Sequence, residues 1–128
     1  HSQNELKDLL NKCGLENHVH HKRMETYSKG MRQKVGIAIA LAKKAKVYLL
    51  DEPASGLDPL ASNELSLILR KLSSMGAAIL MASHDIFRIR ETCNRIGIIK
   101  KGKLVKEMST ADVSTNELEN IYIDYMQK

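Results

Sequence analysis

Two uninterrupted apolar runs stand out in the chain. Val47–Leu50 has four apolar residues in a row, and Ala77–Ala82 is a second run of the same kind. Apolar runs without a polar alternation are typical of strands buried on both faces of a parallel sheet, between layers of helices. We therefore predict two buried strands, with Asp51-Glu52 and Ser83-His84-Asp85 at their carboxyl ends.

Helices are predicted on either side of these runs, where apolar residues recur every three or four positions. Particular residues mark where several of these helices begin. Ser28 and Asp58 are suited to cap a helix, and Pro59 follows Asp58 at the first helical position. Ser114 and Glu117 have the spacing of a capping box. The predicted helices cover residues 4–13, 28–43, 58–76, 85–93 and 114–125.

A hairpin is predicted near the end of the chain, where Ile96–Ile99 and Lys103–Glu107 flank the turn pair Lys101-Gly102. Strands and helices otherwise alternate, which favours an α/β fold with a parallel sheet and right-handed crossovers. A chain of 128 residues is long enough for one compact domain.

The segment between Leu15 and Tyr27 is polar and contains His18, His20 and His21. Clustered histidines can bind a metal ion, but no second ligand group with metal-like spacing accompanies them. We interpret the segment as a solvated loop and keep a metal site as the alternative.

Composition narrows the function classes. The net charge is +5 at pH 7, but the basic residues are scattered in pairs and aromatic residues make up only 4% of the chain. This distribution is typical of a solvated surface, so we expect no nucleic-acid partner. Cys13 and Cys93 are isolated, which fits a reducing compartment and no disulfide framework. No apolar run approaches the length of a membrane span, so at a membrane other chains would have to cross it.

The pair Asp51-Glu52 is the strongest candidate for chemistry. Two carboxylates cannot be buried unpaired without a large cost, so they should lie at the carboxyl end of the strand. Open α/β sheets bind their ligands at that edge. Pro53 lacks a backbone donor and ends the ladder, and Ser55-Gly56 supplies turn residues.

Four segments in one order then resemble the ABC-type ATPases. Tyr27–Gln33 is similar to the ABC signature (the signature segment), and Asp51-Glu52 is similar to the end of the Walker B motif. Ser55–Asp58 is similar to the D-loop, and His84 to the switch histidine. The resemblance covers nearly the whole chain. It implies a partial P-loop NTPase (RecA-like) parallel sheet with flanking helices, part of the ABC helical subdomain, and a carboxyl-terminal β-hairpin plus helix.

The resemblance implies that the signature segment binds ATP held by the opposite subunit, and a helix start with small residues is a physically suitable anion site. The implied contacts come from Ser28, Lys29, Gly30 and Met31. Two positions depart from the family pattern. Lys29 stands where many members have glycine, and Met31 where many have glutamine.

Further roles follow from the same resemblance. Asp51 would lie near Mg²⁺, which prefers carboxylate and water oxygens. Glu52 would be the general base that polarises the attacking water. His84 would contact the γ-phosphate or that water and stabilise the transition state. Asp58 would both cap its helix and line the dimer interface.

No convincing glycine-rich phosphate loop is found in the chain. Gly97 and Gly102-Lys103 have part of the required spacing, but Leu104 replaces the Ser or Thr that ligates magnesium. The predicted context, a strand, a tight turn and a strand, is also wrong for this motif. We therefore interpret the chain as the carboxyl-terminal half of a nucleotide-binding domain. It should expose two strand edges, associate with other chains, and be inactive or very weak as an ATPase alone.

Within this single partial domain we expect a helical and signature segment (about 1–45), half of the catalytic core (46–109) and a carboxyl-terminal helix (110–128). The implied function is ATP hydrolysis coupled to transport, in an exporter of the ABC-2 or bacitracin-resistance type. Partners would be a second ATP-binding domain, transmembrane permease subunits and the amino-terminal half of the same domain, at the cytoplasmic face of the membrane. The alternatives are a non-catalytic interaction module and a soluble ABC ATPase that acts on DNA or ribosomes.

Overall fold

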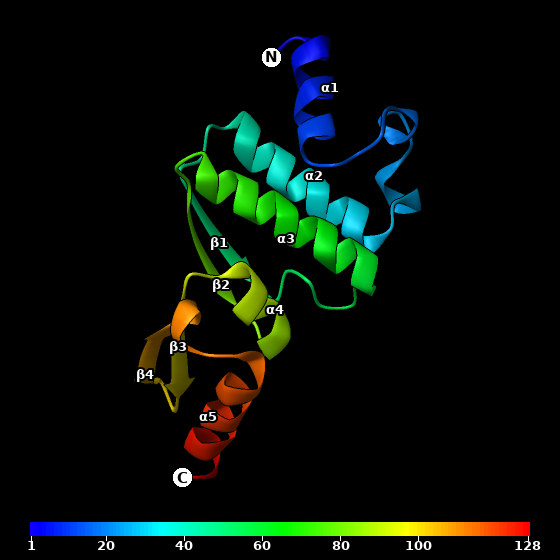
Figure 1. Cartoon of the computed structure of the whole chain (residues 1–128). Helices are drawn as coiled ribbons and strands as arrows, with labels where there is room; N and C mark the ends of the chain where they lie inside the picture. The colour runs from blue at the N-terminus through cyan, green and yellow to red at the C-terminus, as the bar shows by residue number, and fades with distance from the viewer. The chain divides into compact units, whose positions relative to one another are not determined.

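The computed structural model describes all residues from 1 to 128, and the chain forms two compact units, His1–Ala82 and Ser83–Lys128. Figure 1 follows the elements along the chain. The first unit contains α1 (Gln3–Lys12), α2 (Lys29–Ala42), β1 (Val47–Asp51), α3 (Pro59–Ser74) and β2 (Ala78–Ala82). The second unit contains α4 (Ile86–Thr92), β3 (Arg95–Lys100), β4 (Lys103–Ser109) and α5 (Thr115–Gln127).

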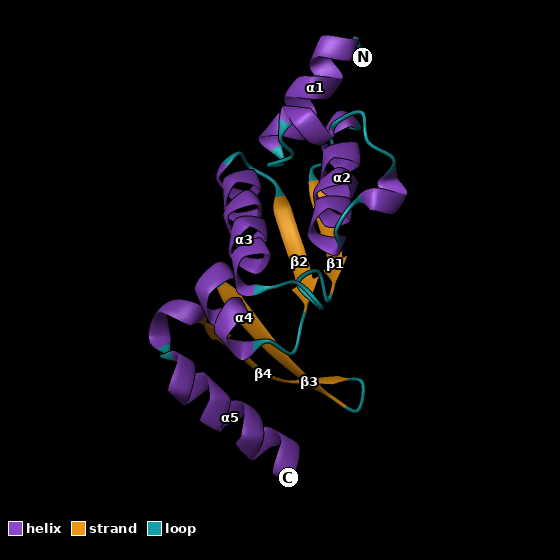
Figure 2. Cartoon of the chain, turned by 90° about the vertical axis from the view of Figure 1, so that its right-hand side faces the viewer, coloured by secondary structure: helices purple, strands orange, loops and turns teal.

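The first unit is built on a parallel pair of strands. β1 and β2 pair in register from Val47 opposite Ala78 to Asp51 opposite Ala82, and α3 is the crossover between them. α2 and α3 lie side by side and cover one face of this pair (Figures 1 and 2). The predicted α/β fold class, with helices flanking a parallel sheet, is confirmed.

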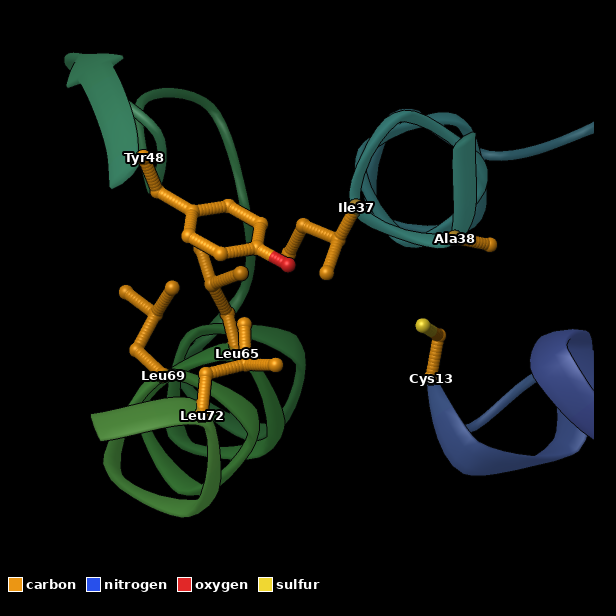
Figure 3. Packing of buried hydrophobic residues seen from close by; sticks show 7 residues of the cluster. All are labelled: Cys13, Ile37, Ala38, Tyr48, Leu65, Leu69 and Leu72. Carbon is orange, nitrogen blue, oxygen red and sulfur yellow. The ribbon is translucent and has the colours of Figure 1, made fainter. Parts of the chain in front are cut away.

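The core of the first unit lies between the two helices and the covered face of the strands. Tyr48 of β1 reaches into this layer toward Ile37 of α2 and the leucines of α3, with the thiol of Cys13 nearby (Figure 3). The fully or nearly buried residues of the cluster are Cys13, Ile37, Ala38, Tyr48, Leu65, Leu69 and Leu72.

The opposite face of the strand pair is bare, and the prediction that both faces are buried is wrong for this chain. Leu49 is 74% exposed, its cross-strand neighbour Leu80 is 70% exposed, and Val47 is 61% exposed. The reason is the pleat. Alternate side chains of a strand point to opposite faces, and helices cover only one of them. Because β1 and β2 pair only with each other, each strand also has an unpaired edge, as the sequence predicted.

The segment between α1 and α2 is more ordered than the predicted solvated loop. Leu15, Val19 and Tyr27 form a second small core, and the Tyr27 hydroxyl donates a hydrogen bond to the backbone oxygen of Val19. Nε2 of His20 lies 2.9 Å from the backbone oxygen of Leu15. Nowhere in the chain are three or more His, Cys, Asp or Glu side chains grouped to hold a metal ion, so the structure gives no support to the metal-site alternative.

The second unit contains the predicted hairpin. β3 and β4 pair antiparallel, and their two-residue loop has positive φ angles at Lys101 (49°) and Gly102 (75°). Positive φ at both positions is typical of the type I′ turn, whose twist matches that of a hairpin. Ile96 and Ile98 of β3 are buried. None of the helices in the chain combines the length and the apolar character needed to span a bilayer.

Candidate functional site

The signature segment forms the start of α2, as the sequence predicted. The Ser28 hydroxyl oxygen accepts a hydrogen bond of 3.1 Å from the backbone N–H of Met31, which makes Ser28 the N-cap. A Cβ added to Gly30 would lie 3.3 Å from Cβ of Ala61 and 3.6 Å from Cδ2 of Leu57. The glycine therefore lets the start of α2 approach the D-loop and the start of α3.

The D-loop leads directly into α3. Oδ1 of Asp58 accepts a hydrogen bond of 2.8 Å from the backbone N–H of Ala61, and Pro59 occupies the first helical turn. Two helix starts, those of α2 and α3, are therefore neighbours in this unit. Each helix start presents unpaired N–H groups and a partial positive charge, so the pair is suited to bind an anion.

The candidate catalytic carboxylates lie where β1 ends. Asp51 is exposed and stands in register with Ala82 of β2, while Glu52 is half-buried. The backbone N–H of Glu52 donates to the carbonyl oxygen of Ala82 over 2.8 Å, and its φ angle is +45°. This left-handed conformation is uncommon for a residue with a side chain. The chain thus turns out of the sheet at Glu52.

Two consecutive turns connect Glu52 to α3. The backbone N–H of Ser55 donates to the oxygen of Glu52, and that of Leu57 to the oxygen of Ala54, both over 3.1 Å. Gly56 has a φ of +73° at the third position of the second turn, where glycine is favoured. The D-loop is therefore a defined turn rather than an open connection.

Lys29 is the site residue that the sequence described least well. Its side chain lies over Gly56: its Nζ is 3.1 Å and its Cδ 3.4 Å from where a Cβ of Gly56 would be. The departure from glycine at position 29 thus creates a contact between the signature segment and the D-loop. Sequence reasoning missed this contact because Gly56 is 27 positions from Lys29 in the chain and belongs to another element.

Met31 takes a more structural position than the sequence suggested. Its backbone N–H is bound by Ser28, and its partly buried side chain packs against the small core of Leu15, Val19 and Tyr27. The side chain of Met31 thus contributes to the small core. A contact between Met31 and a nucleotide stays a prediction.

His84 is the second residue of the second unit, two residues after β2 ends. Its side chain is exposed. The following residue is anchored locally: the N–H of Asp85 donates to the Ser83 hydroxyl oxygen over 3.1 Å, and Oδ1 of Asp85 caps α4 through the N–H of Arg88 at 3.0 Å. These bonds of Ser83 and Asp85 order the backbone on both sides of His84 within the second unit.

The donor set at the end of β1 is compatible with magnesium. Asp51 offers an exposed carboxylate, and Mg²⁺ is usually held by one or two carboxylates together with waters and substrate phosphates. An ion at Asp51 would thus need oxygen ligands from a nucleotide and from water.

Comparisons with known proteins identify relatives of this chain. Residues 1–55 match the family described as ABC transporter. The ABC transporter ATP-binding protein YhcH of Bacillus subtilis is 34% identical over 127 residues, which are 98% of this chain and 41% of that protein. The lantibiotic transport ATP-binding protein SrtF of Streptococcus pyogenes is 38% identical over 106 residues, 83% of this chain and 46% of that protein.

Solved structures show the same fold. The dimeric structure of the ATP-binding cassette MJ0796, in a post-hydrolysis state bound to ADP and Pi, has a TM-score of 0.73 and 27% identity. It is matched over 84% of this chain and 46% of that chain. CbiO1 from Clostridium perfringens, part of the transporter complex CbiONQ, has a TM-score of 0.76 and 28% identity, over 85% and 43% of the two chains. The chain thus spans less than half the length of these relatives.

Proposed function

The chain belongs to the ABC transporter family of ATP-binding proteins, and we propose that it supplies the signature segment, catalytic carboxylate and switch histidine of an ATPase that drives transport. The observation that supports this most directly is the packing of the α2 start, at Gly30, against Leu57 of the D-loop, which follows the end of β1. Two neighbouring helix starts, which are suited to bind an anion, and two carboxylates belong to one compact unit. Phosphoryl transfer depends mainly on such positioning and on electrostatic stabilisation.

The ATP contact would be made by the signature segment toward a nucleotide held by a second ATP-binding domain. Ser28 already uses its hydroxyl oxygen as a helix cap, so the remaining N–H groups of the first turn are the donors we propose for the phosphate oxygens. The related cassette MJ0796 is dimeric and binds ADP and Pi, which supports the proposal of a second ATP-binding domain.

Hydrolysis would depend on the end of β1. Glu52 would accept a proton from the attacking water, and Asp51 would hold Mg²⁺ together with phosphate and water oxygens. The bound Mg²⁺ would supply charge neutralisation for the phosphate oxygens. His84 would donate a hydrogen bond to the γ-phosphate or to the water, which stabilises charge developing in the transition state.

The partners we propose are the amino-terminal half of the same domain, a second ATP-binding domain and transmembrane permease subunits. The bare face of the β1–β2 pair, with Leu49 74% exposed, supports the first partner, because an apolar face of this kind normally packs against other protein. The amino-terminal half would bring the glycine-rich phosphate loop. Such a complex would work at the cytoplasmic face of the membrane.

Transport out of the cell is the direction we favour. The Tyr-Ser-Lys-Gly-Met wording of the signature segment (Tyr27 to Met31) is similar to exporter ATPases of the ABC-2 or bacitracin-resistance type. The relative SrtF is named for lantibiotic transport, whereas another relative, MetN 2 of Oceanobacillus iheyensis, is named for methionine import. Efflux of a labelled substrate from vesicles that contain the complete transporter separates the two directions.

A complementation experiment tests the proposed function. The chain is mixed or co-expressed with the amino-terminal half of a related ATP-binding protein that contains the phosphate loop, and ATP hydrolysis is measured. Each half alone should be inactive or nearly so, and the mixture should hydrolyse ATP. A mixture that binds ATP and forms a stable complex, yet does not hydrolyse it, would instead indicate a non-catalytic module.

A further inference from the structure

The contact between Lys29 and Gly56 joins two segments that are far apart in the sequence. Three atoms of the Lys29 side chain, Cδ, Cε and Nζ, lie 3.4, 3.8 and 3.1 Å from the position that a Cβ of Gly56 would occupy. A residue with a side chain at position 56 would displace Lys29. The lysine therefore occupies space that the glycine leaves open.

Helix stability does not explain a lysine at this position. Lys29 is the first residue of α2, and the N-terminal end of a helix carries a partial positive charge that disfavours cations. No acidic residue lies in the first turn of α2 to offset this, and Lys29 takes part in no ion pair. The side chain is thus placed against the local electrostatic preference, and its contact with Gly56 is what it gains.

We propose that Lys29 is a positioning residue that holds the D-loop (Ser55–Asp58) against the start of α2. The stem atoms Cδ and Cε, together with Nζ, lie against Gly56, which has the positive φ of +73° that defines the turn. The signature segment and the D-loop then keep a fixed spacing and move as one body. The use of this contact in catalysis rests on the proposed function, in which both segments meet a nucleotide held by a partner.

Hydrogen exchange on the 128-residue chain tests the contact without any ATP. The amide of Leu57, which donates to Ala54 within the turn, is the reporter, and amides of the α3 core such as Leu69 are the internal reference. Lys29→Ala removes the stem and should accelerate exchange at Leu57 by about fivefold, because the turn opens locally. Lys29→Met keeps the stem without the charge and should change this rate by less than about twofold. Both substitutes are good helix formers, so α2 is preserved.

Equal Leu57 exchange rates in the unsubstituted chain and in Lys29→Ala would overturn the proposal. An increase of the same size in Lys29→Met would also overturn it, because the charge and not the stem would then be responsible. A global loss of stability would accelerate the Leu69 amide as well. The comparison is therefore made between the two amides of the same molecule.

Steady-state kinetics test the catalytic consequence in the reconstituted ATPase described above. Lys29→Ala should lower kcat by about 3- to 10-fold, with the KM for ATP changed less than about twofold, since a misplaced D-loop affects the bound state. Lys29→Met keeps the stem and should lower kcat less than Lys29→Ala does. If Lys29→Met loses as much as Lys29→Ala and raises KM, the ammonium binds phosphate directly and the positioning role is wrong. Failure of the proposed function itself would appear as no hydrolysis by the unsubstituted complex, whatever the exchange result.

Discussion

The backbone N–H of Glu52 donates a hydrogen bond of 2.8 Å to the carbonyl oxygen of Ala82. This bond continues the β1–β2 ladder by one residue, and it fixes the proposed general base to the end of the neighbouring strand. It does not involve the Glu52 side chain. Substitutions at this position can therefore change the chemistry of the side chain while they keep the backbone in place.

The left-handed backbone at Glu52 leads to a prediction about stability. Its φ angle of +45° is disfavoured for residues with a Cβ, by roughly 1–2 kcal/mol, and glycine is free of this cost. Glu52→Gly should therefore be more stable than Glu52→Ala by about 1 kcal/mol in chemical denaturation. The alanine variant is the matched control, because both variants lose the same carboxylate. Equal free energies of unfolding would contradict the assigned backbone conformation.

Asp58 has two proposed roles that substitutions can separate. Its carboxylate caps α3 through the N–H of Ala61, so Asp58→Ala should lower the free energy of unfolding by about 1 kcal/mol. Asp58→Asn keeps a capping oxygen and should stay within about 0.5 kcal/mol of the original. In the reconstituted ATPase we expect both variants to lose cooperativity between ATP sites. A normal Hill coefficient in Asp58→Asn would restrict Asp58 to its capping role.

Removal of the hydroxyl group from two buried tyrosines should change the free energy of unfolding in opposite directions. The Tyr48 hydroxyl has no hydrogen-bond partner, whereas that of Tyr27 donates to Val19. A buried polar group without a partner costs about 1–3 kcal/mol, so Tyr48→Phe should raise the free energy of unfolding by about 1 kcal/mol. Tyr27→Phe removes one of two donors to the Val19 carbonyl, which keeps its bond from the Lys22 N–H, and should lower the free energy of unfolding by about 0.5–1.5 kcal/mol. Denaturation curves of the two variants check this contrast.

We predict that the buried thiol of Cys13 lowers the stability of the folded chain at alkaline pH. Burial raises the pKa of this thiol to about 11, from an ordinary value of 9.0, while the charge of Lys71 acts in the opposite direction. The folded state therefore holds the proton more tightly, and between pH 9 and 11 the unfolded state loses it first. Stability is unaffected by this group below pH 9. It should fall by roughly 1.4 kcal/mol per pH unit, at most, across that window.

Cys13→Ala is the control for the pH effect. It removes the titrating group, so the difference in stability between the original chain and the variant should shrink as the pH rises from 9 to 11. Tyr48 is present in both chains; its pKa is raised mainly by burial, which the two chains share, and also by the charge of Cys13, an effect that belongs to the measured difference. A difference that is constant with pH would exclude Cys13 as the source.

The sequence was informative wherever a structural rule acts over a few residues. Ser28 and Asp58 cap helices as predicted, and Ser114 forms the expected capping box with Glu117. The turn at Lys101-Gly102 is also where the hairpin reverses. In each case the partners are within three residues of one another, so side-chain type and spacing are enough to define the geometry.

The sequence was less informative about contacts between distant elements. An apolar run identifies the β1 strand, but it does not say what covers each face, and Leu49 is exposed although it is as apolar as its neighbours. The order of residues 15–27 depends on a core that Leu15, Val19 and Tyr27 form together, within a segment that is mostly polar. The contact of Lys29 with Gly56 needs the packing of α2 against the D-loop. None of these leaves a local pattern.

The role of Glu52 is the central claim, and Glu52→Gln tests it most directly in the reconstituted ATPase. The substitution keeps the size of the side chain, and the backbone bond to Ala82 does not depend on the carboxylate. A general base contributes about 10²–10⁴-fold in rate, so kcat should fall by that factor while ATP binding, measured separately, is retained. Hydrolysis at the original rate by Glu52→Gln would contradict the account.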